Sequence, residues 1–168
     1  FSNVLTKDDK FILSKGHCCV PYFLLLREKG FNPVIMGHPE IDEKNGIHCT
    51  TGSLGHGFPQ GIGMALAIKH KNLPSRVYVL IGDGECAEGS IWEGINFAGH
   101  HKINNLILLL DYNNLQIMGH GTDILNSLSF EDKFKSFGWD VKSVDGHDIS
   151  SLSKVLQPQT IVKPLAII

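Results

Sequence analysis

The sequence contains no hydrophobic run long enough to cross a membrane. One of its longest, at residues 106–110, is far shorter than the roughly 20 residues that a transmembrane helix needs. The chain also lacks an excess of charge of either sign, because 15 basic and 17 acidic side chains give a net charge of −2. Nucleic acids and anionic membrane surfaces attract strongly basic proteins, so we expect neither as a partner.

Cysteine is scarce and unpatterned. The four cysteines, at positions 18, 19, 49 and 86, form no CxxC pair and have no ligand-like spacing with histidine. We therefore expect neither a disulfide framework nor a zinc site. No basic segment followed by a hydrophobic core opens the sequence, so we expect a cytoplasmic protein with reduced thiols. Residue 1 is Phe rather than Met, and we expect the sequence to begin inside a longer polypeptide.

The length of 168 residues and the 42% hydrophobic content predict one globular domain, residues 1–168, incomplete at both ends. Periodicity, glycine and proline divide it into elements. We expect helices at 22–29, 59–71, 89–102, 130–140 and 149–157, strands at 76–81, 105–111 and 163–168, a strand and its turn at 141–146, and a long loop over 31–57. Loops of that length are usually functional or disordered.

The segments "RVYVLI", "GSIWEGINFAGHHK" and "NLILLLD" have the composition of a buried strand, a helix and a second buried strand. This order predicts a βαβ unit, whose crossover joins parallel strands. The fold class that follows is α/β, a parallel sheet flanked by helices. Both strands should end at the same edge of that sheet.

Two oxygen-bearing side chains follow these strands. Asp83, between Gly82 and Gly84, comes just after the first strand, and Asn113 comes just after the second. Ligands of open α/β sheets bind at this edge, and a carboxylate with a carboxamide makes an incomplete Mg²⁺ shell that a diphosphate would complete. The glycines would let the backbone approach the phosphates. The alternative interpretation of "GDG" is an ordinary turn.

The stretch "GDGECAEGSIWEGINFAGHHKINNLILLLDYNNLQIMG" resembles the thiamine diphosphate signature of transketolases. The motifs "SKGH", "GHPE", "TGSLGHG" and "FGWDVKSVDGHD" occur in the family's order, so the resemblance covers nearly the whole chain. It implies the thiamine diphosphate-binding fold, with thiamine diphosphate and Mg²⁺, or Ca²⁺ or Mn²⁺, as cofactors. It also implies transfer of a two-carbon ketol unit from a ketose or ketose phosphate to an aldose.

The resemblance assigns roles to single residues. It makes the side chains of Asp83 and Asn113 and the carbonyl of Leu115 the metal ligands, and it places His17 toward the diphosphate. His38 would hydrogen-bond the sugar, and Glu88 would meet a partner's glutamate; with His17, these are the catalytic candidates. The remaining cofactor contacts would come from Gly52, Ser53, Leu54 and Gly55, on the aminopyrimidine side, and from Gly82, Gly84 and Glu85, near the diphosphate.

The family's cofactor lies between two domains, and this chain resembles only the diphosphate-binding one. The resemblance therefore implies a partner, a C-terminal subunit or domain that carries the activating glutamate, in a dimer or an α2β2 assembly. The alternatives are a related ketose-transferring synthase and a non-catalytic thiamine diphosphate-binding or assembly subunit.

Several of these residues also have ordinary structural interpretations. His17 and His38 could be satisfied by backbone, and Glu88 could be a charge at a helix N-terminus. His56 occupies a place where the family usually carries glutamine. The segment 30–37 is shorter than the family pattern, through a deletion or through residues absent from the sequence.

Overall fold

A five-stranded sheet forms the centre of the computed structural model, which describes residues 4–125, 129–157 and 162–168. Its strands lie in the order β1-β2-β3-β7-β6, and every neighbouring pair is parallel. Their bounds are Lys10–Leu13 (β1), Val77–Gly82 (β2), Leu106–Asp111 (β3), Asp140–Lys142 (β6) and Leu165–Ile167 (β7). The predicted α/β class with a parallel sheet is confirmed.

The predicted βαβ unit is also confirmed. Helix α3 (Gly89–His100) connects β2 to β3, and these two strands pair in parallel along their whole length. Their last residues, Gly82 and Asp111, lie opposite each other. Segments that follow the two strands therefore begin side by side at one edge of the sheet.

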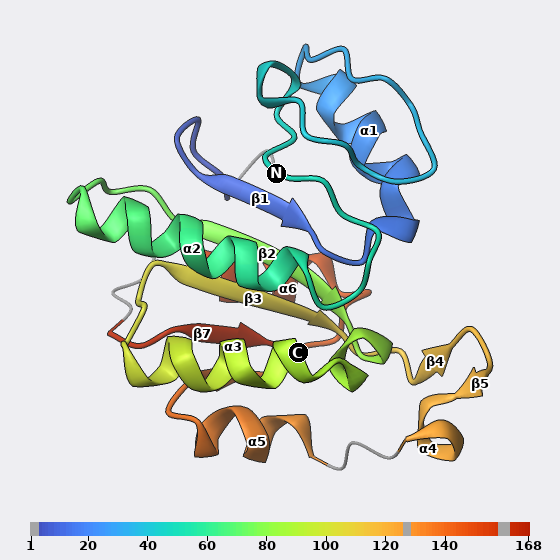
Figure 1. Cartoon of the computed structure of the whole chain (residues 1–168), viewed down its shortest axis with the longest axis vertical. Helices are drawn as coiled ribbons and strands as arrows, with labels where there is room; N and C mark the ends of the chain where they lie inside the picture. The colour runs from blue at the N-terminus through green and yellow to red at the C-terminus, as the bar shows by residue number, and fades with distance from the viewer. Residues whose placement is uncertain (1–3, 126–128, 158–161) are drawn as a thin grey trace.

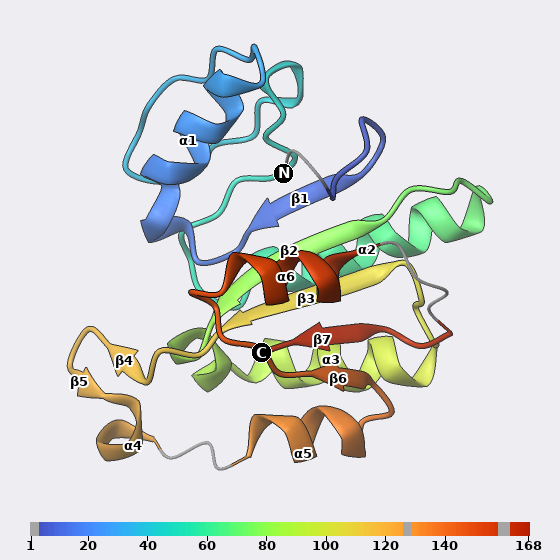
Figure 2. The ribbon, with the colours of Figure 1, turned by 180° about the vertical axis from the view of Figure 1, so that it is seen from behind.

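Helices cover both faces of the sheet (Figures 1 and 2). Helices α2 (Gly57–His70) and α3 lie on one face, and α6 (Ile149–Leu156) lies on the other. Helix α5 (Phe130–Ser136) runs beside α3, and α1 (Cys19–Glu28) lies beyond the β1 edge. No helix in the described part of the chain is long and apolar enough to cross a membrane.

The strands are apolar on both sides because both faces of the sheet are covered. Alternate residues of β2, namely Val77, Val79 and Ile81, belong to the main core together with residues of α2 and α3. Tyr78 belongs instead to a second cluster on the opposite face. A third cluster joins α1 to Leu13 and Ile47.

The four cysteines are free thiols, as expected. Cys19, Cys49 and Cys86 are buried in the hydrophobic clusters, and burial raises the pKa of the Cys49 thiol to about 11. Thiols with raised pKa values are protonated and unreactive at neutral pH. These cysteines act as small core side chains.

Two features were not predicted from the sequence. Strand β1 is only four residues long and includes the charged Lys10, so it has no clear strand pattern. The hairpin of β4 (Leu115–Gln116) and β5 (Gly119–His120), followed by the short helix α4 (Gly121–Ile124), is also too short to produce one. The predicted loop is confirmed over 31–56, with a short 3₁₀ turn at Glu43–Asn45 (η2), and Gly57 already begins α2.

Glycines let α3 pack closely against its neighbours. A Cβ added at Gly99 would lie 1.8 Å from the carbonyl oxygen of Phe137, which is backbone and cannot move alone. A Cβ at Gly94 would lie 2.8 Å from Cδ1 of Ile62 on α2. The indole N–H of Trp139 also donates to the carbonyl of Ile95 on α3, at 2.8 Å. These contacts fix α3, and with it the turn that precedes α3.

We predict that Gly99→Ala lowers the free energy of unfolding by about 1–3 kcal/mol or more, since overpacking forces backbone to shift. Gly63→Ala is the matched control, because a Cβ there meets nothing within 4 Å in the middle of α2. That change should raise stability by up to about 1 kcal/mol. Urea denaturation measures both, and equal effects of the two variants would contradict this packing.

Candidate functional site

The candidate site lies where β2 and β3 end, at the edge of the sheet beside the β4–β5 hairpin (Figure 1). Asp83 follows β2 directly and opens the 3₁₀ turn η3 (Gly84–Ala87). Its backbone N–H donates to the carbonyl of Asp111, the last residue of β3, at 3.2 Å. The parallel pairing therefore continues into the turn and fixes the position of Asp83.

The carboxylate of Asp83 is buried. The residue is 6% exposed, and Oδ1 accepts a hydrogen bond from the backbone N–H of Gly84 at 2.9 Å. Among the described residues it makes no ion pair. Burial raises the pKa of Asp83, and the N–H groups of Gly84 and Asn114 offset only part of that rise. A buried carboxylate that no basic side chain neutralises is suited to holding a cation.

Asn113 lies two residues beyond β3, and its Oδ1 accepts from the backbone N–H of Leu115 at 2.9 Å. Asn114 adopts a left-handed φ of 57°, and its carbonyl accepts from the N–H of Gly121 at 3.0 Å. These bonds fold the segment back so that the hairpin lies beside Asp83. Sequence reasoning overlooked Asn114, although asparagine is one of the few residues that tolerate this conformation.

The structure does not place Asp83 and Asn113 in one hollow. Asp83 lines a small hollow with Asn114, Gln116 and Gly121, whereas Asn113 lines a larger cavity of about 1040 Å³. The larger cavity also includes Asp111 and the turn that contains His147. Tyr112 and Phe130 line both hollows, so the two hollows are adjacent.

Glycines bring the other predicted motifs together. A Cβ at Gly16, in "SKGH", would lie 2.9 Å from the backbone nitrogen of Gly52, in "TGSLGHG". Gly52 in turn packs against the ring of His38, in "GHPE", and a Cβ there would lie 2.9 Å from Cδ2 of that ring. Three segments that are separate in sequence thus meet within van der Waals contact.

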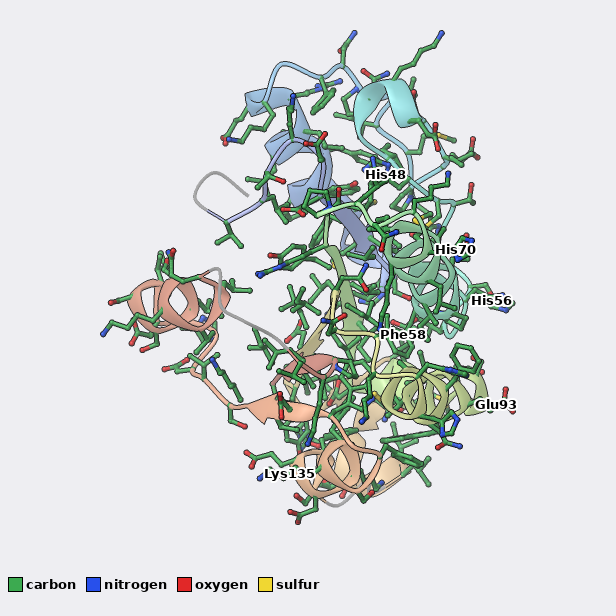
Figure 3. The ribbon with its side chains drawn as sticks, turned by 90° about the vertical axis from the view of Figure 1, so that its left-hand side faces the viewer. His48, His56, Phe58, His70, Glu93 and Lys135 are labelled. Atoms are coloured by element: carbon green, nitrogen blue, oxygen red, sulfur yellow. The ribbon has the colours of Figure 1, made fainter. Side chains whose placement is uncertain are left out.

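The candidate catalytic side chains lie at the surface. His17, His38 and Glu88 are exposed; of the predicted cofactor contacts, Ser53 is exposed, Leu54 is half-buried and Gly55 is buried. His56 precedes α2, and Figure 3 shows its side chain projecting outward, whereas Phe58, two residues later, lies inside. Glu88 is the residue before α3, as a helix N-terminal charge would be, and its side chain makes no capping hydrogen bond.

Glu85 points inward rather than outward. The residue is 1% exposed, and its Oε1 accepts from the hydroxyl of Ser14 and from the backbone N–H of Gly55, at 2.5 and 2.9 Å. The prediction that Glu85 contacts a diphosphate finds no support in this geometry. Gly84, which is half-buried beside Gln116, remains the accessible residue of the pair.

Lys15 and Asp111 form an ion pair that sequence reasoning missed. Nζ of Lys15 lies 2.6 Å from Oδ2 of Asp111, and the two side chains are 8% and 45% exposed. Lys15 follows β1, Asp111 ends β3, and the lysine passes Gly82 at the end of β2. The pair therefore connects three strand ends, next to the backbone hydrogen bond between Asp83 and Asp111. No sequence signal predicts it, because it requires β1 to lie beside β2.

The residues present fit a metal that arrives with its own oxygen donors. The described residues contain no group of three or more His, Cys, Asp or Glu side chains that could hold a metal ion. Mg²⁺ commonly binds through one or two carboxylates and completes its shell with phosphate and water. Asp83 offers a buried carboxylate of this kind beside Gly84, whereas Asn113, whose Oδ1 accepts from the N–H of Leu115, lines the neighbouring cavity.

Comparison with known proteins identifies related sequences along nearly the whole chain. Residues 3–167 match the family described as "Transketolase, thiamine diphosphate binding domain". The chain is 38% identical to the 6-deoxy-6-sulfo-D-fructose transketolase subunit SqwG of Clostridium sp. (strain MSTE9), over 89% of its own length. It is 37% identical to one subunit of the apulose-4-phosphate transketolase of Phocaeicola vulgatus, over 90% of its length. In both cases it spans 58% of the relative.

The fold agrees with these relatives. The transketolase from Leishmania mexicana superimposes with a TM-score of 0.86 at 27% identity, over 95% of this chain and 28% of that protein. The structural similarity therefore covers the same region as the sequence similarity.

We predict that removing Asp111 destabilises the protein more than removing Lys15 does. Asp111→Ala leaves an almost buried ammonium unpaired and should lower the free energy of unfolding by about 1–3 kcal/mol, less than for a fully buried pair because Asp111 is half-exposed. Lys15→Met leaves only a half-exposed carboxylate, which water can solvate, and should cost less. Chemical denaturation of both variants and of the double variant measures the difference. A larger loss of unfolding free energy in Lys15→Met than in Asp111→Ala would contradict this account of the ion pair.

Proposed function

This chain belongs to the transketolase family through its thiamine diphosphate-binding domain, and we propose that it forms the diphosphate-binding half of a transketolase. The complete enzyme would transfer a two-carbon ketol unit from a ketose donor to an aldose acceptor. The observation that carries the proposal is the convergence of four motif segments, around Gly16, His38, Gly52 and Asp83, at the ends of β1, β2 and β3.

Asp83 and Asn113, with the carbonyl of Leu115, would hold the divalent cation, which we propose to be Mg²⁺. Gly82 and Gly84 carry no side chain on either side of Asp83, and the half-buried Gly84 would let phosphate oxygens approach the backbone closely. The residues 52–55 would line the aminopyrimidine side, and His17 would face the diphosphate. Burial of Asp83 supports this assignment, because a bound cation would compensate the desolvated carboxylate.

Thiamine diphosphate, when bound, supplies the electron sink that lets the C2–C3 bond of a ketose break. The chain's own residues would orient the sugar and move protons. His38 is held against Gly52 with its ring in contact with the backbone, so its position is defined although it is exposed. We propose that His38 hydrogen-bonds the donor's terminal hydroxyl, a role that suits an imidazole ring, which can both donate and accept a hydrogen bond.

The substrates would be sugars that carry an anionic group. The two relatives are named for 6-deoxy-6-sulfo-D-fructose and apulose-4-phosphate, which bear a sulfonate and a phosphate. We propose a ketose with such a group as the donor for this chain as well.

A second polypeptide or domain would complete the site. The chain spans 58% of relatives that are themselves named as subunits, and His17, His38 and Glu88 lie open at the surface. Glu88 directly precedes α3 and makes no capping hydrogen bond to its own helix, so its carboxylate could meet a glutamate of the partner. We propose an assembly of two such chains with two pyrimidine-binding partners, or a dimer of longer chains, in the cytoplasm.

We predict that Asp83→Ala strongly weakens Mg²⁺-dependent binding of thiamine diphosphate, because the cation that offsets the diphosphate charge loses a ligand. Calorimetry on the complete protein measures this affinity. Asp123→Ala is the control, since Asp123 is an exposed acid in α4 near the same edge. Unchanged metal-dependent affinity in Asp83→Ala would exclude this residue as a ligand.

The same affinity should depend on pH in a defined direction. Protonation competes with metal binding, and burial raises the pKa of Asp83, so affinity should begin to fall at a higher pH than an ordinary aspartate would allow. Asp83→Ala should lose this part of the pH dependence. An identical pH profile in both proteins would contradict the assignment.

We further predict that the 168-residue chain alone shows no ketol transfer and gains it when a pyrimidine-binding partner is added. Without the second wall the reacting groups are poorly oriented, and orientation can account for roughly 7–11 kcal/mol of a barrier. A steady-state assay of ketose consumption, with cofactor and Mg²⁺, before and after addition of the partner tests this. Full activity of the isolated chain would overturn the two-part site.

A further inference from the structure

Side chains from one segment hold both polar groups of Gly55. The N–H of Gly55 donates to Oε1 of Glu85 at 2.9 Å, and its carbonyl accepts from the hydroxyl of Ser90 at 2.7 Å. The same Oε1 of Glu85 accepts from the hydroxyl of Ser14 at 2.5 Å. We refer to Ser14, Gly55, Glu85 and Ser90 as the Gly55 clamp.

The Gly55 clamp leaves no space for a larger residue. Gly55 has a φ of +79°, and a Cβ there would lie 2.6 Å from Oγ of Ser90 and 2.7 Å from Cβ of Glu88. A Cβ at Gly57 would lie 2.6 Å from Oγ of Ser14. The loop 51–57 is therefore in direct contact with the end of β1 on one side and with the start of α3 on the other.

Stability of the fold alone does not account for Glu85. Its carboxylate is almost completely buried, makes no ion pair among the described residues, and has one oxygen, Oε2, without a hydrogen-bond partner there. Burying an uncompensated carboxylate is unfavourable, and an apolar side chain of similar size would avoid that penalty. The carboxylate does, however, bind two donors from two other segments with a single oxygen.

Those two segments are the ones that would surround the cofactor. Ser14 directly precedes Lys15 and the "GH" of "SKGH", and Gly55 closes the loop 52–55. Glu85 and Ser90 lie on either side of Glu88, within the segment that begins at Asp83. The Gly55 clamp thus sets the separation between the loop and the turn after β2.

We propose that Glu85 and Ser90 are positioning residues, which hold the loop 52–55 at a fixed distance from the turn 83–88 in the free protein. This inference rests on the proposed function, in which the cofactor binds between these two segments. A site that is already ordered avoids the entropic penalty of ordering its loops on binding. Glu85 and Ser90 therefore raise cofactor affinity without touching the cofactor.

Three variants test the clamp by calorimetry of thiamine diphosphate binding at saturating Mg²⁺, on the complete protein. Ser90→Ala and Glu85→Ala should each weaken binding, by about threefold to tenfold or more, the effect of losing an ordering hydrogen bond. Glu85→Gln should retain affinity within about threefold, because its carbonyl oxygen can accept both hydrogen bonds. Rescue by glutamine separates positioning from any need for the charge.

Asn105→Ala is the matched control for stability. Its amide donates to the carbonyl of Ala65 at 2.9 Å, at the opposite, amino end of β3. This variant should lower Tm and leave cofactor affinity unchanged. If Asn105→Ala weakens binding as much as Ser90→Ala does, the affinity merely follows stability, and the proposal is wrong.

Hydrogen exchange of the Gly55 amide in the cofactor-free protein gives a second, independent measurement. Exchange should accelerate in Glu85→Ala and Ser90→Ala relative to amides of β2, and remain slow in Glu85→Gln and Asn105→Ala. Failure of the wild type to bind thiamine diphosphate would refute the proposed function, whereas the exchange rates would still report on the clamp. Unchanged Gly55 exchange in both alanine variants would overturn the clamp itself.

Discussion

The parallel pairing of β2 with β3 is the constraint on which the candidate site depends. It sets Gly82 opposite Asp111, so that the next residues of both strands, including Asp83 and Asn113, emerge at the same edge. Parallel strands require a crossover, and here that crossover is α3. The helix must therefore begin at this edge as well, which places η3 and Glu88 beside Asp83. One pairing thus accounts for the positions of three segments.

Close packing at glycine extends this arrangement to the rest of the chain. Gly99 and Gly94 let α3 approach Phe137 and Ile62, while Gly52 and Gly55 let the loop 51–57 contact His38 and the start of α3. Glycine thus permits close contacts between helices in the core and close contacts of the loop at the site. Interiors are close-packed, so changes at such positions are transmitted rather than absorbed.

The charged side chains near the site differ in whether an ion pair compensates them. Lys15 forms an ion pair with Asp111, whereas Asp83 and Glu85 are buried carboxylates without an ion-pair partner among the described residues. For Asp83, a bound cation would offset the desolvation that raises the pKa of its carboxyl. For Glu85, the two donors from Ser14 and Gly55 provide partial compensation. The buried carboxylates of Asp83 and Glu85 thus lie where the motif segments converge. Functional sites commonly contain such groups, at a loss in folding stability.

The sequence alone determined the α/β class, the βαβ unit and the placement of Asp83 and Asn113 after neighbouring strands, because continuous apolar runs and flanking glycines are local signals. The sequence also indicated the family, through short motifs such as "SKGH", "GHPE" and "TGSLGHG". Only the tertiary structure decided that "KFIL" is a strand, since four residues beside β2 carry no periodic pattern. The same holds for the Lys15–Asp111 pair and for the inward turn of Glu85: Lys15 and Asp111 are 96 residues apart, and Gly55 and Glu85 are 30 apart. Contacts of that kind depend on which strands become neighbours, which is a property of the packed sheet and not of any one segment.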